Sequence, residues 1–286
     1  MKFGLFAVLR AFLGIFLVTA ITMFAVSVSF GGDKISVPPT VFEYGGDDYC
    51  VIWETSKKGS GYVKYSFEGE EIVRYDEAGG VIRTDETIHR VFVPKEELRE
   101  NEYVVGSQYV GFKKAYDAIK GETVESEAIR FGGAEKEDDI KILSVSDIHG
   151  AEFFLYRAVS RLDYTPDLIV ILGDAASGME TKAHFSAKVL ENAARLSGGS
   201  VPVAFVRGNH EARGEFASRL AEYLPVSGDG LYYSFEFGPL SAVVLDTGED
   251  KEDGHREYSG LVDFETYRAR EQEWIDSLSA GDFGGR

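Results

Sequence analysis

The sequence predicts a layered α/β domain preceded by a small all-β sandwich and an N-terminal hydrophobic helix. Three observations lead to this prediction. An unbroken apolar stretch occupies residues 11–30, short alternating runs fill residues 37–131, and strands alternate with helices from residue 140 onward. The last pattern is typical of a largely parallel sheet covered by helices, and closely spaced short strands are typical of a sandwich.

The first segment, residues 1–32, carries a targeting signal. Lys2 and Arg10 are followed by the apolar run over 11–30, which as a helix is about one membrane thickness long. A basic start before an apolar stretch fits a cleaved signal peptide. An uncleaved membrane anchor fits equally, and a buried core helix is a third interpretation. The first two place the rest of the protein outside the cytoplasm, either secreted or anchored at its N-terminus.

The second segment, residues 37–131, contains runs such as DYCVIWET, YVKYSF and IHRVFVP, separated by turn clusters such as KKGSG and EGE. This spacing predicts the sandwich. Residues 113–122, KKAYDAIKGE, break the rhythm and predict a loop or a helical turn. Residues 132–139, GGAEKEDD, change from glycine to charge and predict a linker.

In the third segment, residues 140–286, predicted strands alternate with predicted helices. IKILSVS, DLIVIL and VPVAFV predict buried strands, and LYYSFEFG and LSAVVLDTG predict two more. Apolar residues at helical spacing predict the helices that alternate with them. The last of these helices is expected to begin after Asp263 as its N-cap.

Three consecutive strands of this segment end in side chains that can bind metal ions. These are Asp147 and His149, then Asp174, then Asn209 and His210. Each group alone would be an ordinary polar turn. Ligands of open α/β sheets bind beyond the carboxyl ends of the strands, so three such groups in succession predict one shared site. Oxygen and imidazole ligands suit Mn, Fe or Zn ions.

Composition narrows the possible partners. The formal net charge is −18, so the chain is repelled by phosphate backbones and no polymeric nucleic acid is expected as a partner. Cys50 is the only cysteine, which excludes an intrachain disulfide and a zinc site built on cysteines. A small phosphate ester is still compatible, because bound metal ions can reverse the local charge.

The motifs SDIHG, ILGDA and RGNHE resemble, in order and strand context, the first three motifs of the calcineurin-like metallophosphoesterases. The β-rich segment looks like the fibronectin-type-III-like N-terminal domain of purple-acid-phosphatase-like members. The resemblance spans about residues 37–278. It implies a metallophosphoesterase domain over 140–286 that hydrolyses phosphate esters by attack of a metal-bridging hydroxide.

The resemblance also implies a role for each strand-end residue. Asp147 and His149 would bind the first of two metal ions, and Asp174 would bridge both. Asn209 would bind the second ion, and His210 would act as the catalytic residue beside the phosphate. The two ions would be Fe, Mn or Zn.

The sequence departs from the family pattern in two places. Ser177 stands where purple acid phosphatases carry an iron-binding tyrosine. The later single-histidine and Gly-His-x-His motifs do not occur, and the only later histidine, His255, lies in an acidic loop. We therefore expect an incomplete metallophosphoesterase domain that lacks its C-terminal histidine ligands, either as a fragment or as a naturally inactive form.

Two alternatives remain open at this stage. The first is a non-catalytic extracytoplasmic binding protein with a phosphoesterase-like scaffold. The second is a nuclease or nucleotidase of the same superfamily. Substrate, metal identity and oligomeric state are not determined by the sequence.

Overall fold

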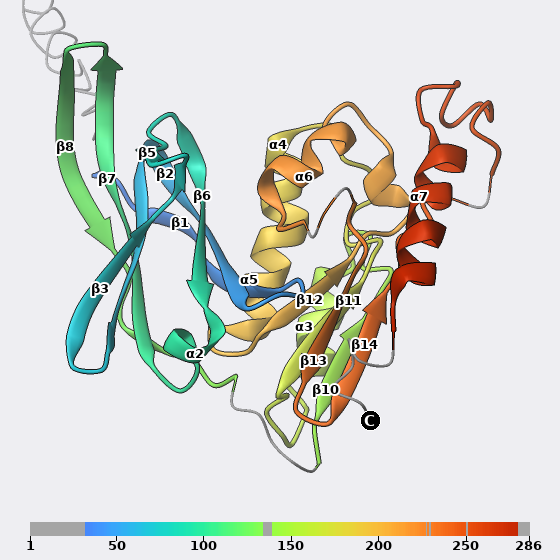
Figure 1. The fold of residues 1–286 in the computed structure, drawn as a ribbon, viewed down its shortest axis with the longest axis horizontal. Helices are drawn as coiled ribbons and strands as arrows, with labels where there is room; N and C mark the ends of the chain where they lie inside the picture. Colours follow the sequence, from blue (N-terminus) through green and yellow to red (C-terminus); the bar gives the residue numbers. More distant parts are fainter. Residues whose placement is uncertain (1–31, 134–138, 227, 229, 250, 280–286) are drawn as a thin grey trace, which may run out of the picture. The chain divides into compact units, whose positions relative to one another are not determined.

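A computed structural model of the chain describes residues 32–133, 139–226, 228, 230–249 and 251–279. The described residues from Asp33 onward belong to one unit (Figure 1). The apolar run over 11–30 lies outside the described residues, so the predicted N-terminal helix stays a prediction. Within the described residues, no helix has the length and apolar character that crossing a membrane requires.

The first part of the unit is all-β, as predicted, apart from one short helix. Its elements are β1 (Ile35–Glu43), β2 (Asp48–Phe67), β3 (Glu70–Tyr75), β4 (Glu77–Ala78), β5 (Val81–Ile82), β6 (Glu86–Pro94), α2 (Lys95–Leu98), β7 (Glu102–Lys114), β8 (Asp117–Glu125) and β9 (Ile129–Arg130).

Strand β2 joins two layers of this region. Its first half pairs with β1 and β6, and its second half pairs with β3 and β7. Side chains from both halves meet in one core, where Tyr49, Trp53 and Val63 are fully buried. Alternate residues of a strand point to opposite faces, so the other face of β1 and β2 is free to pack elsewhere.

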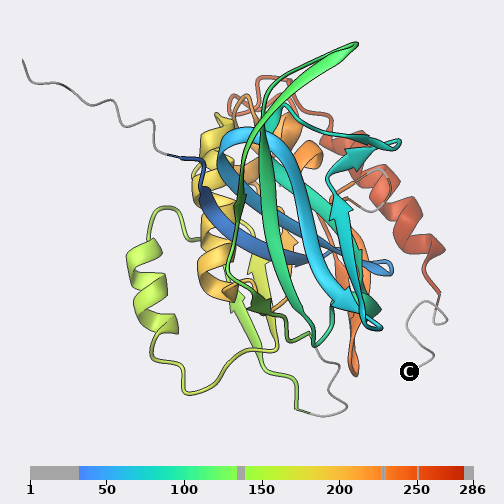
Figure 2. The ribbon, with the colours of Figure 1, turned by 90° about the vertical axis from the view of Figure 1, so that its left-hand side faces the viewer.

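The segment KKAYDAIKGE was predicted as a loop or a helical turn, and that prediction is wrong. It forms the end of β7 and the start of β8, with Phe112 opposite Ile119 and Lys114 opposite Asp117. The hairpin extends beyond its neighbours (Figure 2). Because β8 is exposed along nearly its whole length, it needs no apolar alternation, and its sequence therefore does not look like a strand.

The second part alternates strands and helices. Its elements are β10 (Ile142–Val145), α3 (Glu152–Val159), β11 (Leu168–Leu172), α4 (Lys182–Phe185), η1 (Ser186–Leu190), α5 (Glu191–Ser197), β12 (Val203–Val206), η2 (His210–Ala212), η3 (Ala217–Arg219), α6 (Leu220–Tyr223), β13 (Tyr233–Phe237), β14 (Leu240–Val244) and α7 (Phe264–Ser277).

The two parts share one sheet. Strands β10, β11 and β12 are parallel neighbours, and β12 also pairs in parallel with β1, with Phe42 opposite Val203. The segment predicted as a linker thus separates the parts along the chain, while hydrogen bonds join them in the sheet. The domain boundaries themselves stay a prediction.

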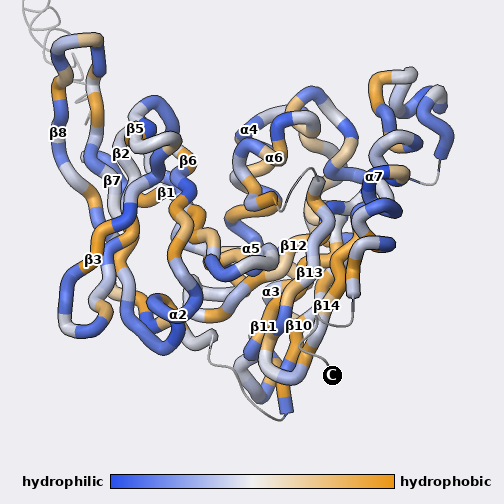
Figure 3. The backbone as a smooth tube through the Cα atoms, viewed as in Figure 1, coloured by the Kyte–Doolittle hydropathy of each residue, from blue (hydrophilic) through white to orange (hydrophobic). Residues whose placement is uncertain are grey.

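Two layers cover this shared sheet. Phe185, Val189 and Ala193 of α4, η1 and α5 pack on one face against Ile169 of β11 and Phe42 of β1. The hairpin β13–β14 packs on the opposite face. Both layers cover strands that are hydrophobic along their length (Figure 3). The result is the layered α/β architecture that the strand–helix alternation predicted.

Two helices differ in how they meet the sheet. Helix α7 begins where predicted, with the side chain of Asp263 accepting a hydrogen bond from the Thr266 backbone. Helix α3 forms as predicted but buries no residue, and Phe153 and Phe154 are 68% and 72% exposed. Its neighbour β10 is the edge strand of the sheet. The carboxyl end of β10 is therefore much less enclosed than those of β11 and β12.

Candidate metal centre

The parallel register of β10, β11 and β12 places their carboxyl ends at one edge of the sheet. Val145 stands opposite Ile171, and Leu172 stands opposite Val206. Loops 146–151, 173–178 and 207–213 leave the sheet at this edge and carry every side chain that the sequence predicted for the site. The position matches the rule for ligand sites in open α/β sheets.

Three of the predicted ligands sit in a strained backbone conformation. Asp147, His149 and Asp174 have φ angles of +52°, +43° and +54°. Left-handed backbone is uncommon outside glycine and costs on the order of 1–3 kcal/mol for other residues. Such strain persists where the surroundings or a ligand favour it, and it clusters at functional sites.

Two glycines let the second and third loops approach closely. A side-chain carbon on Gly173 would strike the backbone of Gly208, and one on Gly208 would strike the carboxylate of Asp174. The glycine before Asp174 and the glycine before Asn209 are thus required by the contact between these loops.

The imidazole of His149 lies between two carboxylates. Its Nε2 is 3.8 Å from Asp147 Oδ1 and 3.8 Å from Asp174 Oδ2. Its other ring nitrogen, Nδ1, is 3.4 Å from the hydroxyl of Ser177. A hydrogen bond on one ring nitrogen fixes the other as the ligand atom, which is the usual arrangement of metal-binding histidines.

The rings of His149 and His210 meet edge to face at 4.4 Å between centroids. Ligand atoms of His149, Asp174 and His210 all lie within 4.8 Å of one another. Two ligands at roughly 2.1 Å from one metal stand roughly 3–4 Å apart, so these atoms are near enough to share an ion after a small approach. The donor set of carboxylate and imidazole therefore fits a transition metal or zinc.

Both ring nitrogens of His210 have protein partners. Nδ1 is 3.0 Å from the carbonyl oxygen of Ser177 and must donate to it, and Nε2 is 3.2 Å from Nη1 of Arg213, which donates to it. In this pattern Nδ1 acts as the donor and Nε2 as the acceptor. The backbone N–H of His210 also donates to Asp174 Oδ1 at 3.0 Å.

Asn209 is held by a residue that the sequence analysis missed. Its Nδ2 donates to Glu249 Oε2 at 2.8 Å, which leaves the amide oxygen as the atom of this side chain that can bind a cation. Glu249 follows β14, so a fourth strand also ends in a polar group directed at this edge. The signal was present in the sequence as the acid after LSAVVLDTG, but the acidic loop around it suggested solvent exposure.

Glu249 is 8% exposed and connects several groups. Besides Asn209, its Oε2 accepts hydrogen bonds from Arg213 at 2.6 Å and from the Tyr258 hydroxyl at 2.7 Å. Arg213 in turn reaches Glu257 at 3.2 Å. A buried carboxylate with a cation and two further donors is well compensated, and it fixes Asn209 relative to Arg213.

Glu211, the last residue of the RGNHE motif, is a buried carboxylate with a structural role. It is fully buried and accepts hydrogen bonds from the backbone N–H groups of Asp174, Ala176 and Gly208 at 2.8–3.2 Å. Burial raises the pKa of this carboxyl group, and the three backbone donors oppose that shift. Glu211 thereby clamps the second loop to the third.

His255 lies apart from this constellation. Its backbone N–H bonds the Glu252 carbonyl within the loop after β14, and the group formed by His149, Asp174 and His210 does not include it. Among the described residues, the structure groups His149, Asp174 and His210. Asp147 adjoins this group through His149, and the Asn209 amide nitrogen is held by Glu249.

Comparison with known proteins identifies one family. The model of the calcineurin-like phosphoesterase family matches residues 140–282. No curated protein matches the chain. Among solved structures, the cytochrome b5 reductase domain of Ulva prolifera nitrate reductase aligns at 10% identity over 62% of this chain and 73% of that chain, with a TM-score of 0.15. A score this low supports no conclusion about the fold.

Proposed function

Because the chain belongs to the calcineurin-like phosphoesterase family, we propose that its strand-end site binds two metal ions and hydrolyses a small phosphate ester. The observation that carries this proposal is the convergence of His149, Asp174 and His210 from three separate loops. No observation favours the non-catalytic alternative.

In this proposal each side chain has one task. Asp147 and His149 would hold the first ion, Asp174 would contribute to both, and Asn209 would hold the second through its amide oxygen. Two ions of this kind neutralise the phosphate and lower the pKa of water, whatever their identity among Fe, Mn and Zn. Ser177 orients His149 through its 3.4 Å contact and replaces the iron-binding tyrosine of purple acid phosphatases.

Arg213 and His210 would meet the substrate. Hydrolysis forms a bond from the water oxygen to phosphorus and breaks the ester P–O bond, and the departing alcohol oxygen takes up a proton. His210 can supply that proton only when protonated, and then Nε2 no longer accepts the bond from Arg213. The Nη1 donor released from His210 can then bond a phosphate oxygen, while Nη2 stays paired with Glu249.

The remaining assignments are proposals of the same kind. The sequence of residues 11–30 supports an extracytoplasmic location by secretion or by anchoring, and an anchor would bring contact with a membrane. The two-layer β region supports a fibronectin-type-III-like, purple-acid-phosphatase-like arrangement. The net charge of −18 argues for small esters over polymeric nucleic acid.

The test is metal binding by the 286-residue chain, followed by hydrolysis of p-nitrophenyl phosphate. We expect weak Mn²⁺ or Zn²⁺ binding with little turnover, because only Asp147, His149, Asp174 and Asn209 are proposed as ligands. We expect Asp174→Asn to lower the affinity for the metal ion at least a hundredfold. His255→Gln is the matched control and should bind as the wild type does. Titration calorimetry measures both. A chain that binds no metal, or an Asp174→Asn variant that binds normally, contradicts the proposal.

A further inference from the structure

The hairpin of β7 and β8 ends in a turn that carries an exposed aromatic side chain. The strands pair as far as Lys114 and Asp117, and Ala115 and Tyr116 form the turn. The side chain of Tyr116 is fully exposed, and that of Ile119 is 54% exposed. The hairpin extends beyond its neighbours (Figure 2), so the described part of the fold gives these two side chains no apolar cover.

The same tip is basic, although the chain is acidic. Residues 113–120, KKAYDAIK, contain three lysines and one aspartate, and all of them are exposed. The formal net charge of the whole chain is −18. Lys58 lines the same surface cavity as Lys113, together with Arg83 and Asp85. The tip therefore has a local excess of positive charge.

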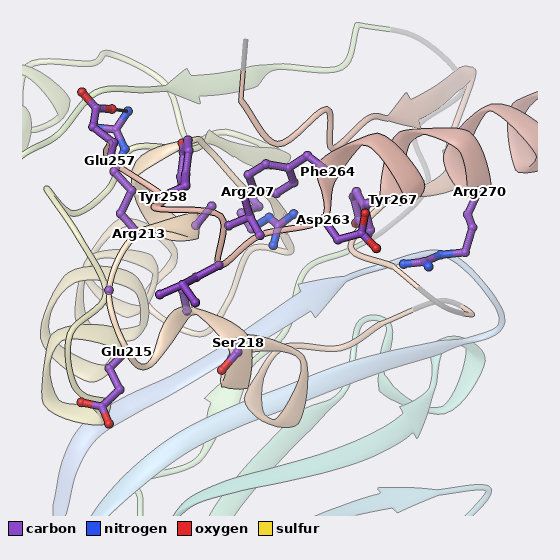
Figure 4. A pocket seen from close by; sticks show the side chains of 15 residues that line it. Arg207, Arg213, Glu215, Ser218, Glu257, Tyr258, Asp263, Phe264, Tyr267 and Arg270 are labelled. Atoms are coloured by element: carbon purple, nitrogen blue, oxygen red, sulfur yellow. Dashed lines mark ion pairs between the residues drawn. The ribbon is translucent and has the colours of Figure 1, made fainter. Parts of the chain in front are cut away.

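The lysines of the tip have no carboxylate partner within the described part of the chain. Lys113 donates from Nζ to the Ile82 carbonyl at 3.4 Å, and neither Lys113 nor Lys114 forms an ion pair there. Several cations elsewhere are paired. Arg213, for example, meets Glu257 at 3.2 Å at the pocket shown in Figure 4. The ammonium groups of the tip are thus available to an anion outside the protein.

The opposite end of the β region carries the reverse charge. The turn between β2 and β3 contains Glu68, and β3 begins with Glu70 and Glu71, all exposed. This turn lies at the other end of β7 (Figure 1), because Tyr65 of β2 pairs with Tyr103 at the start of β7. A negatively charged surface would attract the lysine end and repel the glutamate end, which gives the region one preferred orientation.

The chain also enters the fold at the lysine end. Asp33 follows the apolar run over 11–30 by three residues, and its carboxylate accepts a hydrogen bond from the Lys57 backbone at 3.1 Å. The Nζ of Lys57 lies 5.4 Å from the ring of Tyr109 on β7. An anchor formed by the apolar run would therefore join the fold beside the strand that leads to Tyr116.

We propose that the tip of the β7–β8 hairpin, residues 113–120, docks onto an anionic phospholipid surface. Tyr116 and Ile119 enter the interfacial layer, where aromatic side chains are favoured, and the lysines contact the headgroup phosphates. The inference rests on the proposed membrane contact and does not depend on the metal centre. It adds that the β region is held against the bilayer, and not left free on its tether.

The experiment places an environment-sensitive fluorophore at the tip of the full chain. Ala118→Cys supplies the labelling site, because the native Cys50 is fully buried. Glu70→Cys, at the opposite end of the β region, is the control position. The labelled chains are reconstituted with vesicles of phosphatidylcholine, with and without phosphatidylglycerol. We expect phosphatidylglycerol to raise the emission of the label at 118 about twofold or more and to leave the label at 70 unchanged.

Charge variants in the Ala118→Cys chain test the lysines. Lys113→Gln combined with Lys114→Gln should remove most of the increase, because each lysine near an anionic surface contributes about fivefold to binding. Arg157→Gln combined with Arg161→Gln removes the same charge from exposed positions on and just after α3, and it should leave the increase unchanged. All four side chains are exposed, so both variants should fold normally, and circular dichroism spectra will check this.

Flotation of the vesicles separates this inference from the proposed membrane contact. A chain that floats with vesicles while its label at 118 stays in water, or whose increase survives loss of the two lysines, overturns the docking of the tip alone. An equal increase in neutral vesicles indicates that the tip packs against a second copy or another protein, and it overturns the docking as well. A chain that floats with neither kind of vesicle overturns the membrane contact and the docking together.

Discussion

The two sides of the metal centre are built in different ways. On one side Asp174 has a 16% exposed side chain, and Glu211 beneath it is fully buried with three backbone hydrogen bonds. On the other side Asp147 is 70% exposed and follows the edge strand β10. The family motifs give no hint of this difference, because each motif is simply a strand followed by polar residues.

This difference indicates which part of the metal centre has its geometry fixed by the protein alone, without a bound metal ion. The side around Asp174 and Asn209 is fixed by the buried carboxylates of Glu211 and Glu249. Left-handed backbone occurs on both sides, at Asp147, His149 and Asp174, but the side around Asp147 and His149 has little burial to compensate for it. We infer that the first side is preformed and that the second depends on a bound ion for its geometry.

The largest expected effect is a difference in the free energy of unfolding between a variant on one side of the metal centre and a variant on the other. Glu211→Gln places an amide N–H₂ against backbone donors in a buried position, so it should lower the free energy of unfolding by about 2–3 kcal/mol. Asp147→Asn changes an exposed side chain and keeps a residue type that tolerates left-handed backbone, so its effect should stay within about 0.5 kcal/mol. Urea unfolding in metal-free buffer measures both. Equal losses would show that the two sides do not differ.

A smaller effect concerns Glu249, which holds Asn209 without being a proposed ligand. Glu249→Gln should weaken Mn²⁺ binding about tenfold, because residues that orient metal ligands typically contribute 10–100-fold to affinity. Glu252→Gln, in the same acidic loop, is the control for the loss of a charge. Titration calorimetry distinguishes them. If both variants lose the same affinity, Glu249 acts only through its charge and positions nothing.

The smallest effect is one of local order. Addition of Mn²⁺ should slow amide hydrogen exchange several-fold in residues 146–151, where the backbone is strained and exposed. Residues 208–212 should change less, since Glu211 already clamps them. Exchange followed by mass spectrometry in the presence and absence of metal measures this. Greater protection at 208–212 than at 146–151 would reverse the comparison.

The sequence predicted much of the fold because its alternation is strong where strands are buried. It placed the three strands that lead to Asp147, Asp174 and Asn209, and it placed the start of α7 at Asp263. It failed for residues 113–122 because an exposed hairpin carries no apolar pattern. It also did not predict that Phe42 on β1 would stand opposite Val203, since pairing across the whole chain leaves no local signal.

For the site, the sequence predicted the residues of the three motifs but not the residues that hold them in place. Glu249 and Arg213 were missed because their roles come from contacts between loops, and a charged residue in a polar loop looks the same whether it is solvated or buried. Their recognition required the 2.8 Å contact to Asn209 and the 3.2 Å contact to His210.

The pairing of β1 with β12 also determines when the protein can finish folding. About 160 residues separate the paired positions Phe42 and Val203. At translation rates of about 5–20 residues per second, β1 emerges roughly ten to thirty seconds before its partner is made. During that interval its Phe42 face and one row of backbone groups have no partner, which is the situation in which nascent chains aggregate or engage chaperones. The first strand of the fold, β1, therefore stays incompletely paired until β12, the strand that leads to Asn209, has been made.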